Sequence, residues 1–206
     1  MTVMFNTKDF ECFTVAGLDQ RMAAIRQEIQ PKFQALDDYF SAELAPLLGE
    51  ELLVHIAQHR RRTTNAPDFT WSAIGGNKRG YKKFPHFTLG ITGDYIVMWL
   101  SFIDNPQNEK VMAEALLAEP RLFANLPRDF KINLDHTQNN YQALGEADLT
   151  AALTRWRDVK KGEFQIGRII EANSELLKDP LVAREYMLET YRLLVPIYQK
   201  TRRLSE

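Results

Sequence analysis

Several features that would set this chain apart from ordinary globular proteins are missing from its sequence. It has one cysteine, Cys12, so no internal disulfide can form, and no histidine or other base stands near it to make it a nucleophile. The longest apolar run worth testing, residues 95–103, is far shorter than the ~20 residues that a membrane helix needs. The opening residues MTVMFNTKDFECF contain neither a basic leader nor a long apolar stretch. We therefore expect a cytoplasmic protein without a membrane partner.

An excess of charge is also missing. The formal net charge is −1 and the pI is near 6.5, which argues against a protein that coats nucleic acid over its whole surface. Apolar residues make up 45% of the chain and charged residues 26%, as in ordinary globular proteins. There is no internal repeat, low-complexity tract or linker. We predict one domain over residues 1–206, since a chain of this length can bury a core without disulfides.

The apolar periodicity indicates the fold class. Steps of three and four from Leu18 to Leu47 predict a long helix or two helices end to end, with Pro31 either kinking the one or starting the second. Further patterns predict strands at 52–59, 69–74, 86–91, 95–103, 130–134 and 164–170, and helices at 109–126, 149–159 and from Pro180 onward. Because successive strands follow short turns, we expect an α+β domain: a mainly antiparallel sheet with helices packed on one face, a two-layer sandwich.

One segment, His55–Phe87, concentrates the residues that an ordinary core does not need. It contains three of the four histidines, and residues 55–86 carry seven Lys or Arg against a single acid, Asp68. This gives the segment a net charge of +6 in a chain whose total is −1, which predicts a patch that attracts anions. Arginine and lysine bind phosphate or carboxylate, and aromatic rings between them can stack on a flat ligand.

We therefore predict a ligand-binding set in this segment: Arg60, Arg61, Arg62, Asn65, Trp71, Lys78, Arg79, Tyr81, Lys82, His55, His59 and His86. Two other interpretations of the basic residues stay open. They can edge the sheet in solvent, where lysine discourages strand pairing, or they can pair with acids elsewhere, such as Asp37, Asp38 or Glu43.

The stretches HIAQHRRRTTNAPDFTW and NKRGYKKFPHF, together with the opening GLDQRMAAIRQEIQPKF, resemble the YktB-like family of uncharacterised bacterial proteins over nearly the whole chain. Two positions depart from the family pattern: Ala66 stands where a second proline is expected, and Phe69 where an acid precedes Thr-Trp. Neither touches the basic residues. The resemblance implies a single α+β domain without an established activity, so it provides no catalytic residues.

Three patterns in the chain resemble known motifs but lack features that those motifs need, and we predict no metal or cofactor. Gly75 and Gly80 have the spacing of a phosphate-binding loop, but the Lys-Ser/Thr that must follow is absent, and Pro85 forbids the helix. His55 and His59 form HIAQH without the glutamate of a zinc protease, and on a strand their rings would lie ~13 Å apart. Asp135 is adjacent to His136, and adjacent side chains rarely orient each other.

The sequence leaves three hypotheses of function. The favoured one is binding of a phosphate-bearing ligand, a nucleotide or nucleic acid, through the basic segment. The second is an enzyme acting on a small anionic substrate, with His55, His59 or His86 as acid or base. The third is a module whose basic edge docks an acidic protein. The oligomeric state is open.

Overall fold

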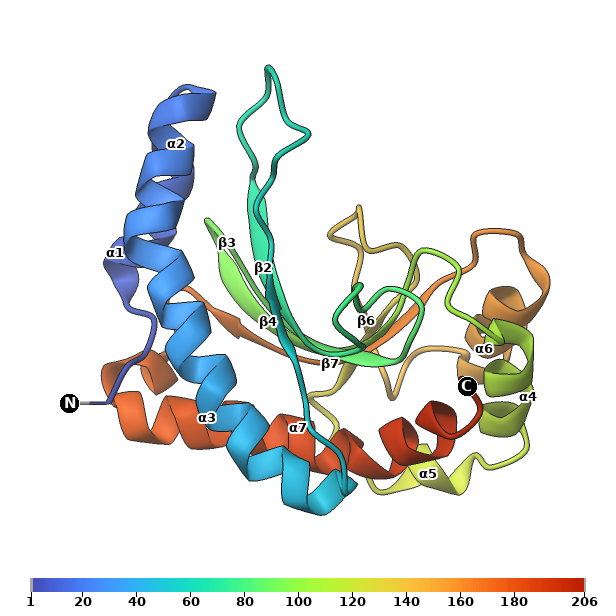
Figure 1. Ribbon diagram of the computed structural model, residues 1–206. Coiled ribbons are helices and arrows are strands. Elements are labelled where there is room, and N and C mark those ends of the chain that lie inside the picture. The colour runs from blue at the N-terminus through green and yellow to red at the C-terminus, as the bar shows by residue number, and fades with distance from the viewer. Residues whose placement is uncertain (1, 206) are drawn as a thin grey trace.

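The computed structural model describes residues 2–205, which form a strongly curved antiparallel sheet with helices on its convex face (Figure 1). The strands are β1 (Val54–Ile56), β2 (Phe69–Gly75), β3 (His86–Thr92), β4 (Tyr95–Phe102), β5 (Lys131–Asn133), β6 (Gln142–Ala143) and β7 (Phe164–Glu171). Their order in the sheet is β1-β2-β3-β4-β7-β5-β6, and every pair is antiparallel. The predicted α+β class and antiparallel sheet are confirmed.

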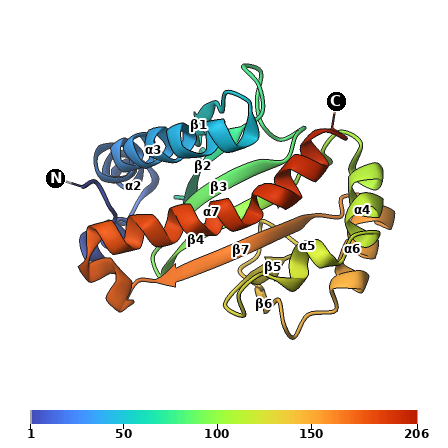
Figure 2. The ribbon, with the colours of Figure 1, turned by 90° about the horizontal axis from the view of Figure 1, so that it is seen from below.

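The helices gather on one side of this sheet, as predicted (Figures 1 and 2). They are α1 (Thr7–Glu11), the 3-10 turn η1 (Cys12–Thr14), α2 (Leu18–Ala24), the π-helical η2 (Ile25–Ile29), α3 (Gln30–Leu48), α4 (Glu109–Leu117), α5 (Arg121–Ala124), α6 (Leu149–Asp158), the 3-10 turn η3 (Glu175–Lys178) and α7 (Pro180–Arg202). Figure 2 shows α3 and α7 side by side beneath the central strands. No helix within residues 2–205 is long and apolar enough to cross a membrane.

The alternation of side chains along the central strands decides what each face of the sheet presents. On β4, Ile96, Met98 and Leu100 point to the helices and join the main core. Tyr95 and the other alternate residues of β4 point to the concave face, where helices do not cover the sheet (Figure 1). The two layers therefore leave a curved, partly aromatic surface available on the inner side.

The N-terminal helical region settles the two interpretations of Pro31. Residues 18–48 are continuously helical, but the turn Ile25–Ile29 is widened to a π-helix directly before α3. Pro31 then lies in the first turn of α3, directly after this widened turn, so the proline is accommodated inside a continuous helical region. Gly49 ends the helix in the left-handed region at φ 71°.

Two local predictions need correction. The strand predicted over 52–59 is shorter, Val54–Ile56, because His59 has a positive φ of 50° and leaves the sheet. The short helix α1 was not predicted from the sequence. It is stabilised by a capping box, in which the side chain of Asn6 accepts from the backbone and that of Asp9 accepts from Asn6 N–H at 2.7 Å.

Candidate functional site

A cavity of about 280 Å³ lies on the concave face, where the curved sheet meets the loop between β5 and β6. Its apolar lining consists of Phe69, Trp71, Val97, Trp99, Ile103 and Tyr141, and its polar lining of Arg62, His86, Thr88, Asn133, His136, Thr137, Gln138, Asn139 and Gln165. A mostly apolar hollow with a few converging polar groups is typical of small-molecule sites.

Aromatic rings form one wall of the cavity. Phe69 and Trp71 stack with their ring centroids 5.6 Å apart and their planes 15° apart. The opposite partner of Trp71 on β3 is Gly90, and a Cβ there would lie 2.5 Å from the ring of Phe69. Tyr141, from the β5–β6 loop, lies 5.4 Å from the ring of Trp99. The wall depends on a glycine that leaves room for the Phe69 ring.

A row of polar side chains crosses the same face. His86, Ser101, Gln165 and Asn133 occupy facing positions on β3, β4, β7 and β5, and all four are buried. The amide of Gln165 donates to Ser101 Oγ at 2.8 Å, and the amide of Asn133 donates to Gln165 Oε1 at 3.2 Å. Thr88 and Ser101 share a hydrogen bond of 2.9 Å. The row therefore holds its amides in set orientations.

His86 ends this row as a neutral imidazole. Its Nδ1–H donates to the carbonyl oxygen of Phe84 at 2.9 Å, so Nε2 carries the lone pair. Burial, with a smaller contribution from the charge of Lys82, lowers the pKa of His86 to about 4. Nε2 is buried and has no hydrogen-bond partner within residues 2–205. His86 therefore offers a free acceptor beside the cavity.

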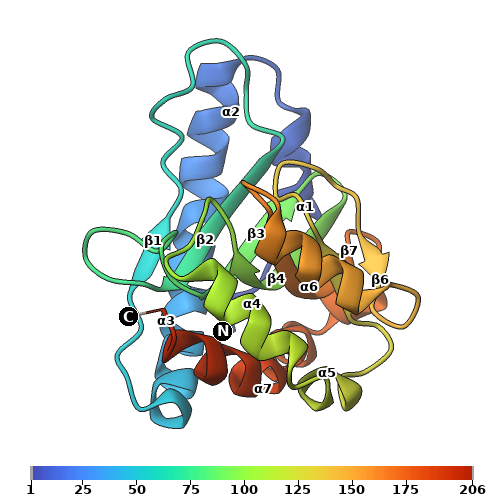
Figure 3. The ribbon, with the colours of Figure 1, turned by 90° about the vertical axis from the view of Figure 1, so that its right-hand side faces the viewer.

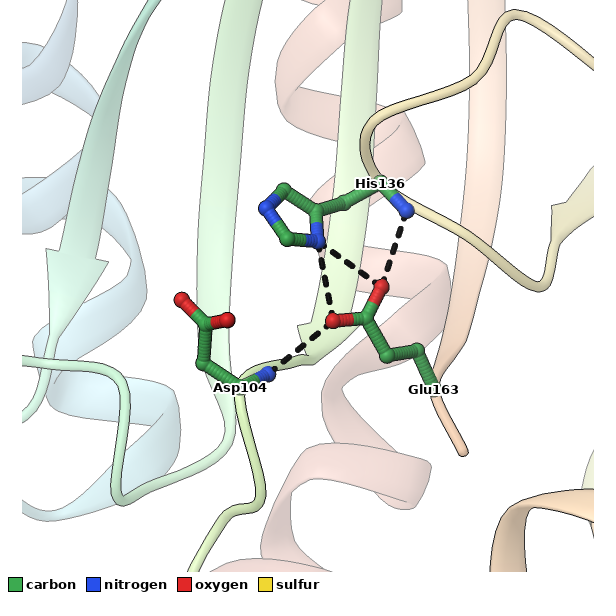
Figure 4. Close-up of side chains that lie close together, drawn as sticks. All are labelled: Asp104, His136 and Glu163. Atoms are coloured by element: carbon green, nitrogen blue, oxygen red, sulfur yellow. Dashed lines mark hydrogen bonds and ion pairs between the residues drawn. The ribbon is translucent and has the colours of Figure 1, made fainter. Parts of the chain in front are cut away.

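The histidine on the loop above the sheet, His136, is held by Glu163 rather than by its neighbour Asp135 (Figure 4). Its Nδ1 lies 2.9 Å and 2.8 Å from the two carboxylate oxygens, and its backbone N–H donates to Oε2 at 2.9 Å. The hydrogen bond to Glu163 raises the pKa of His136 above its ordinary value. Asp135 accepts from the backbone and hydroxyl of Thr137 instead, as expected for adjacent residues.

The set Asp104, His136 and Glu163 also has the composition of a metal site, since one ligand atom of each lies within 4.8 Å of the others. These ligand atoms already have other partners, however. Glu163 accepts from His136 and from the backbone N–H of Asp104 at 3.1 Å, and Asp104 pairs with the ammonium of Lys82. The two carboxylates therefore suit a protonated imidazole and an ammonium group better than a metal ion.

Comparison with known proteins gives the family. Residues 5–198 match the family model described as "Domain of unknown function (DUF1054)". The chain belongs to this family. A DUF1054 relative called UPF0637 protein from Enterococcus faecalis is 61% identical over 96% of this chain and 97% of its own length. Similar proteins from Shouchella clausii and Listeria monocytogenes are 44% and 41% identical over 95% of the chain, and over 93% and 96% of their own lengths. The resemblance to uncharacterised bacterial proteins is confirmed.

In this DUF1054 protein the predicted ligand-binding residues divide into three groups. Arg62, Trp71 and His86 line the cavity. A second group lies beside the cavity and consists of His55, His59 and Tyr81. The ring of Tyr81 contacts those of His55 and His86. The ring of His59 contacts that of Trp71, and its Nε2 shares a hydrogen bond of 3.0 Å with the hydroxyl of Thr70. The third group is exposed and lies on two segments, 57–68 and 76–85, that leave the β1–β2 edge in different directions (Figure 3); it consists of Arg60, Arg61, Asn65, Lys78 and Arg79. Lys82, on the second segment, pairs with Asp104.

Pairing of the basic segment with Asp37, Asp38 or Glu43 is wrong. Asp37 is fully buried under the sheet, Asp38 accepts from Gln34, and Glu43 pairs with Arg192. These acids lie on α3, which covers the convex face, whereas Arg62 lines the concave one. These three acids are buried or have other partners, so they do not pair with the basic segment, in which Lys82 pairs with Asp104 instead.

Sequence reasoning missed much of the site: Thr88, Trp99, Asn133, His136, Tyr141 and Gln165. A signal was present in the strand patterns. Trp99 and Ser101 alternate with the core residues of β4, which indicates a second face with aromatic and polar groups. Nothing local indicated that Gln165 would lie beside Ser101, or Asn133 beside Gln165, 32 residues away.

Proposed function

We propose that the cavity binds a small phosphate-bearing ligand with a flat ring, a mononucleotide being the simplest. The observation that carries this proposal is that Arg62, the aromatic wall and three of the four side chains of the polar row line one hollow. A guanidinium binds a phosphate through two parallel N–H groups, and aromatic faces stack on a base whatever its sequence.

The neutral side chains suit the edge of a nucleobase. Gln165 keeps one N–H donor, Asn133 keeps acceptor capacity at its amide oxygen, and Thr88 offers a hydroxyl, and burial strengthens the hydrogen bonds that they make. A volume of about 280 Å³ is near the lower end of the range for small-molecule sites. It favours one nucleotide over a nucleic-acid strand.

Arg62 is available for an anion. Its guanidinium donates to the carbonyl oxygen of Asn65 at 3.1 Å, and no ion pair joins it to a carboxylate in the part of the chain that the structure describes. The nearby cation Lys82 is neutralised by Asp104. The positive charge at the cavity therefore comes from Arg62.

Calorimetric titration with adenosine monophosphate, adenosine and inorganic phosphate tests the proposal. We expect the nucleotide to bind more tightly than either part, and Arg62→Ala to weaken it by about 10- to 100-fold, as for a lost charge-assisted hydrogen bond. Arg61→Ala is the matched control, since Arg61 lies on the same loop outside the cavity lining.

Absence of binding by all three probes would overturn the proposal. Equal losses in Arg61→Ala and Arg62→Ala, with tighter binding of oligonucleotides than of the monophosphate, would place the ligand on the exposed loop and favour a strand over a mononucleotide. A steep fall of affinity with salt would accompany that result.

A further inference from the structure

Two histidines whose pKa values are shifted in opposite directions line this one cavity. His86 comes from the sheet, where burial keeps it neutral and the Nδ1–H bond to Phe84 fixes its tautomer, while His136 comes from the loop above and is held by Glu163. They are close enough for the charge of His136 to influence His86. Two titratable groups whose surroundings push their pKa values apart are the usual signature of an acid and a base.

We propose that the cavity hydrolyses a phosphodiester, with His136 as the general acid and His86 as the general base. This inference rests on the proposed binding of a phosphate-bearing ligand and names the chemical class of that ligand and its reaction.

The bond from Nδ1 to Glu163 leaves Nε2 of His136 to carry the transferable proton. Figure 4 shows Nε2 on the side of the ring away from Glu163. Glu163 is buried and accepts three N–H groups, so it positions the ring and stabilises its charged form. Glu163 is therefore a positioning residue, and His136 is the catalytic one.

The proton balance closes without a metal or cofactor. The oxygen of a water attacks phosphorus while its proton passes to Nε2 of His86, and the bond from phosphorus to the leaving oxygen breaks. Nε2 of His136 gives its proton to that oxygen, so the products are a phosphomonoester and an alcohol. Exchange with solvent then removes the proton from His86 and returns one to His136.

Charge favours a diester over a monoester. Lys82 is balanced by Asp104, and His136 by Glu163, which leaves the single charge of Arg62 for the ligand. A phosphodiester carries one negative charge, whereas a monoester carries up to two near neutral pH. A protonated histidine also serves the poor leaving group of a diester.

The test uses two diester probes, adenosine 2′,3′-cyclic phosphate and bis(4-nitrophenyl) phosphate, and the monoester 4-nitrophenyl phosphate, all in EDTA with products followed by phosphorus NMR. We expect turnover of both diesters and little of the monoester. His136→Gln and His86→Gln should each reduce turnover by about 100-fold or more while adenosine monophosphate still binds. Asp135→Asn, which removes a carboxylate that holds Thr137 instead of His136, should leave turnover unchanged.

The pH profile separates chemistry from structure. Turnover should fall at low pH as His86, which faces Lys82, His55 and His136, gains a proton, and at high pH as His136, which faces Glu163, Asp104, Asp135 and Lys82, loses one. Glu163→Gln should move the alkaline limb to lower pH, and a purely structural role would leave that limb in place.

Binding of adenosine monophosphate without turnover of either diester overturns this inference and leaves the proposed binding function standing. Turnover abolished by EDTA and restored by a divalent ion also overturns it, in favour of a metal at Asp104, His136 and Glu163. If His86→Gln fails to fold, His136→Gln decides the outcome, because its side chain is 29% exposed and fills no part of the core.

Discussion

The indole N–H of Trp71 donates a hydrogen bond of 2.8 Å to the hydroxyl of Tyr81. Tyr81 lies on the basic segment after β2, and its ring also contacts His86 at 4.7 Å. One hydroxyl therefore ties the segment 76–85 to the aromatic wall of the cavity. The position of that segment depends on this bond as well as on its own turns.

We predict that Tyr81→Phe destabilises the protein by about 1 kcal/mol, because the N–H of Trp71 loses its partner in a half-buried position. Urea unfolding measures this. Trp71→Phe and the double variant complete a double-mutant cycle. Removing both partners should cost less than the sum of the single changes, and strict additivity would show that the bond contributes nothing.

Gly90→Ala should disturb the aromatic wall. The new Cβ would lie 2.5 Å from the ring of Phe69 and 2.9 Å from Val97, so the ring must move. We expect a loss of about 1–3 kcal/mol and a changed tryptophan fluorescence, because Phe69 stacks on Trp71. Gly145→Ala is the control, since nothing lies within 4 Å of a Cβ there. Equal stability of the two variants would contradict the proposed tightness of the wall.

Asp37 makes stability depend on pH. Its carboxyl is fully buried in α3 beside the hydroxyl of Ser72, and burial raises its pKa from 3.8 to about 8. The unfolded chain releases this proton at a lower pH than the folded one. Asp37 therefore favours the folded state at low pH, and that contribution is lost as the pH rises from 3.8 toward 8, by up to about 1.4 kcal/mol per pH unit.

Asp37→Asn should accordingly raise the free energy of unfolding at pH 8 and flatten its dependence on pH. Chemical denaturation at a series of pH values measures both effects. Asp38→Asn, at an exposed position of the same helix, should change both much less, because the charge of Asp38 is only a minor cause of the raised pKa of Asp37. A variant of Asp37 that is less stable at pH 8 would show that the hydrogen bond with Ser72 outweighs the cost of burying the carboxylate.

The contact between His136 and Glu163 should be visible in a titration of the imidazole by NMR. The hydrogen bond from Nδ1 to Glu163 raises the pKa of His136, so Glu163→Gln should lower that pKa toward its ordinary value. The pair stabilises the fold while His136 is protonated, and this contribution is lost as pH rises through the raised pKa. Asp135→Asn should shift the pKa of His136 much less, and a larger shift there would contradict the assigned partner.

Local chemistry carried much of the fold prediction. The hairpin of β3 and β4 follows from the alternating side chains on either side of Thr92 and Gly93. Helix α7 follows from the N-cap Asp179 and begins at Pro180, where predicted. The candidate site was predicted less well. The charge of Arg60, Arg61 and Arg62 drew attention to one loop, yet of these three only Arg62 lines the cavity.

The sequence by itself determined most of the strands, the long helices, the α+β class and the membership in the family, because each depends on neighbouring residues or on matching positions along the chain. The tertiary structure alone decided the site. Insertion of β7 between β4 and β5 places Gln165 beside Ser101 and brings Glu163 to His136. Such pairings join segments far apart in sequence, and they form because the curved sheet buries its convex face against the helices, a global condition that no local pattern encodes.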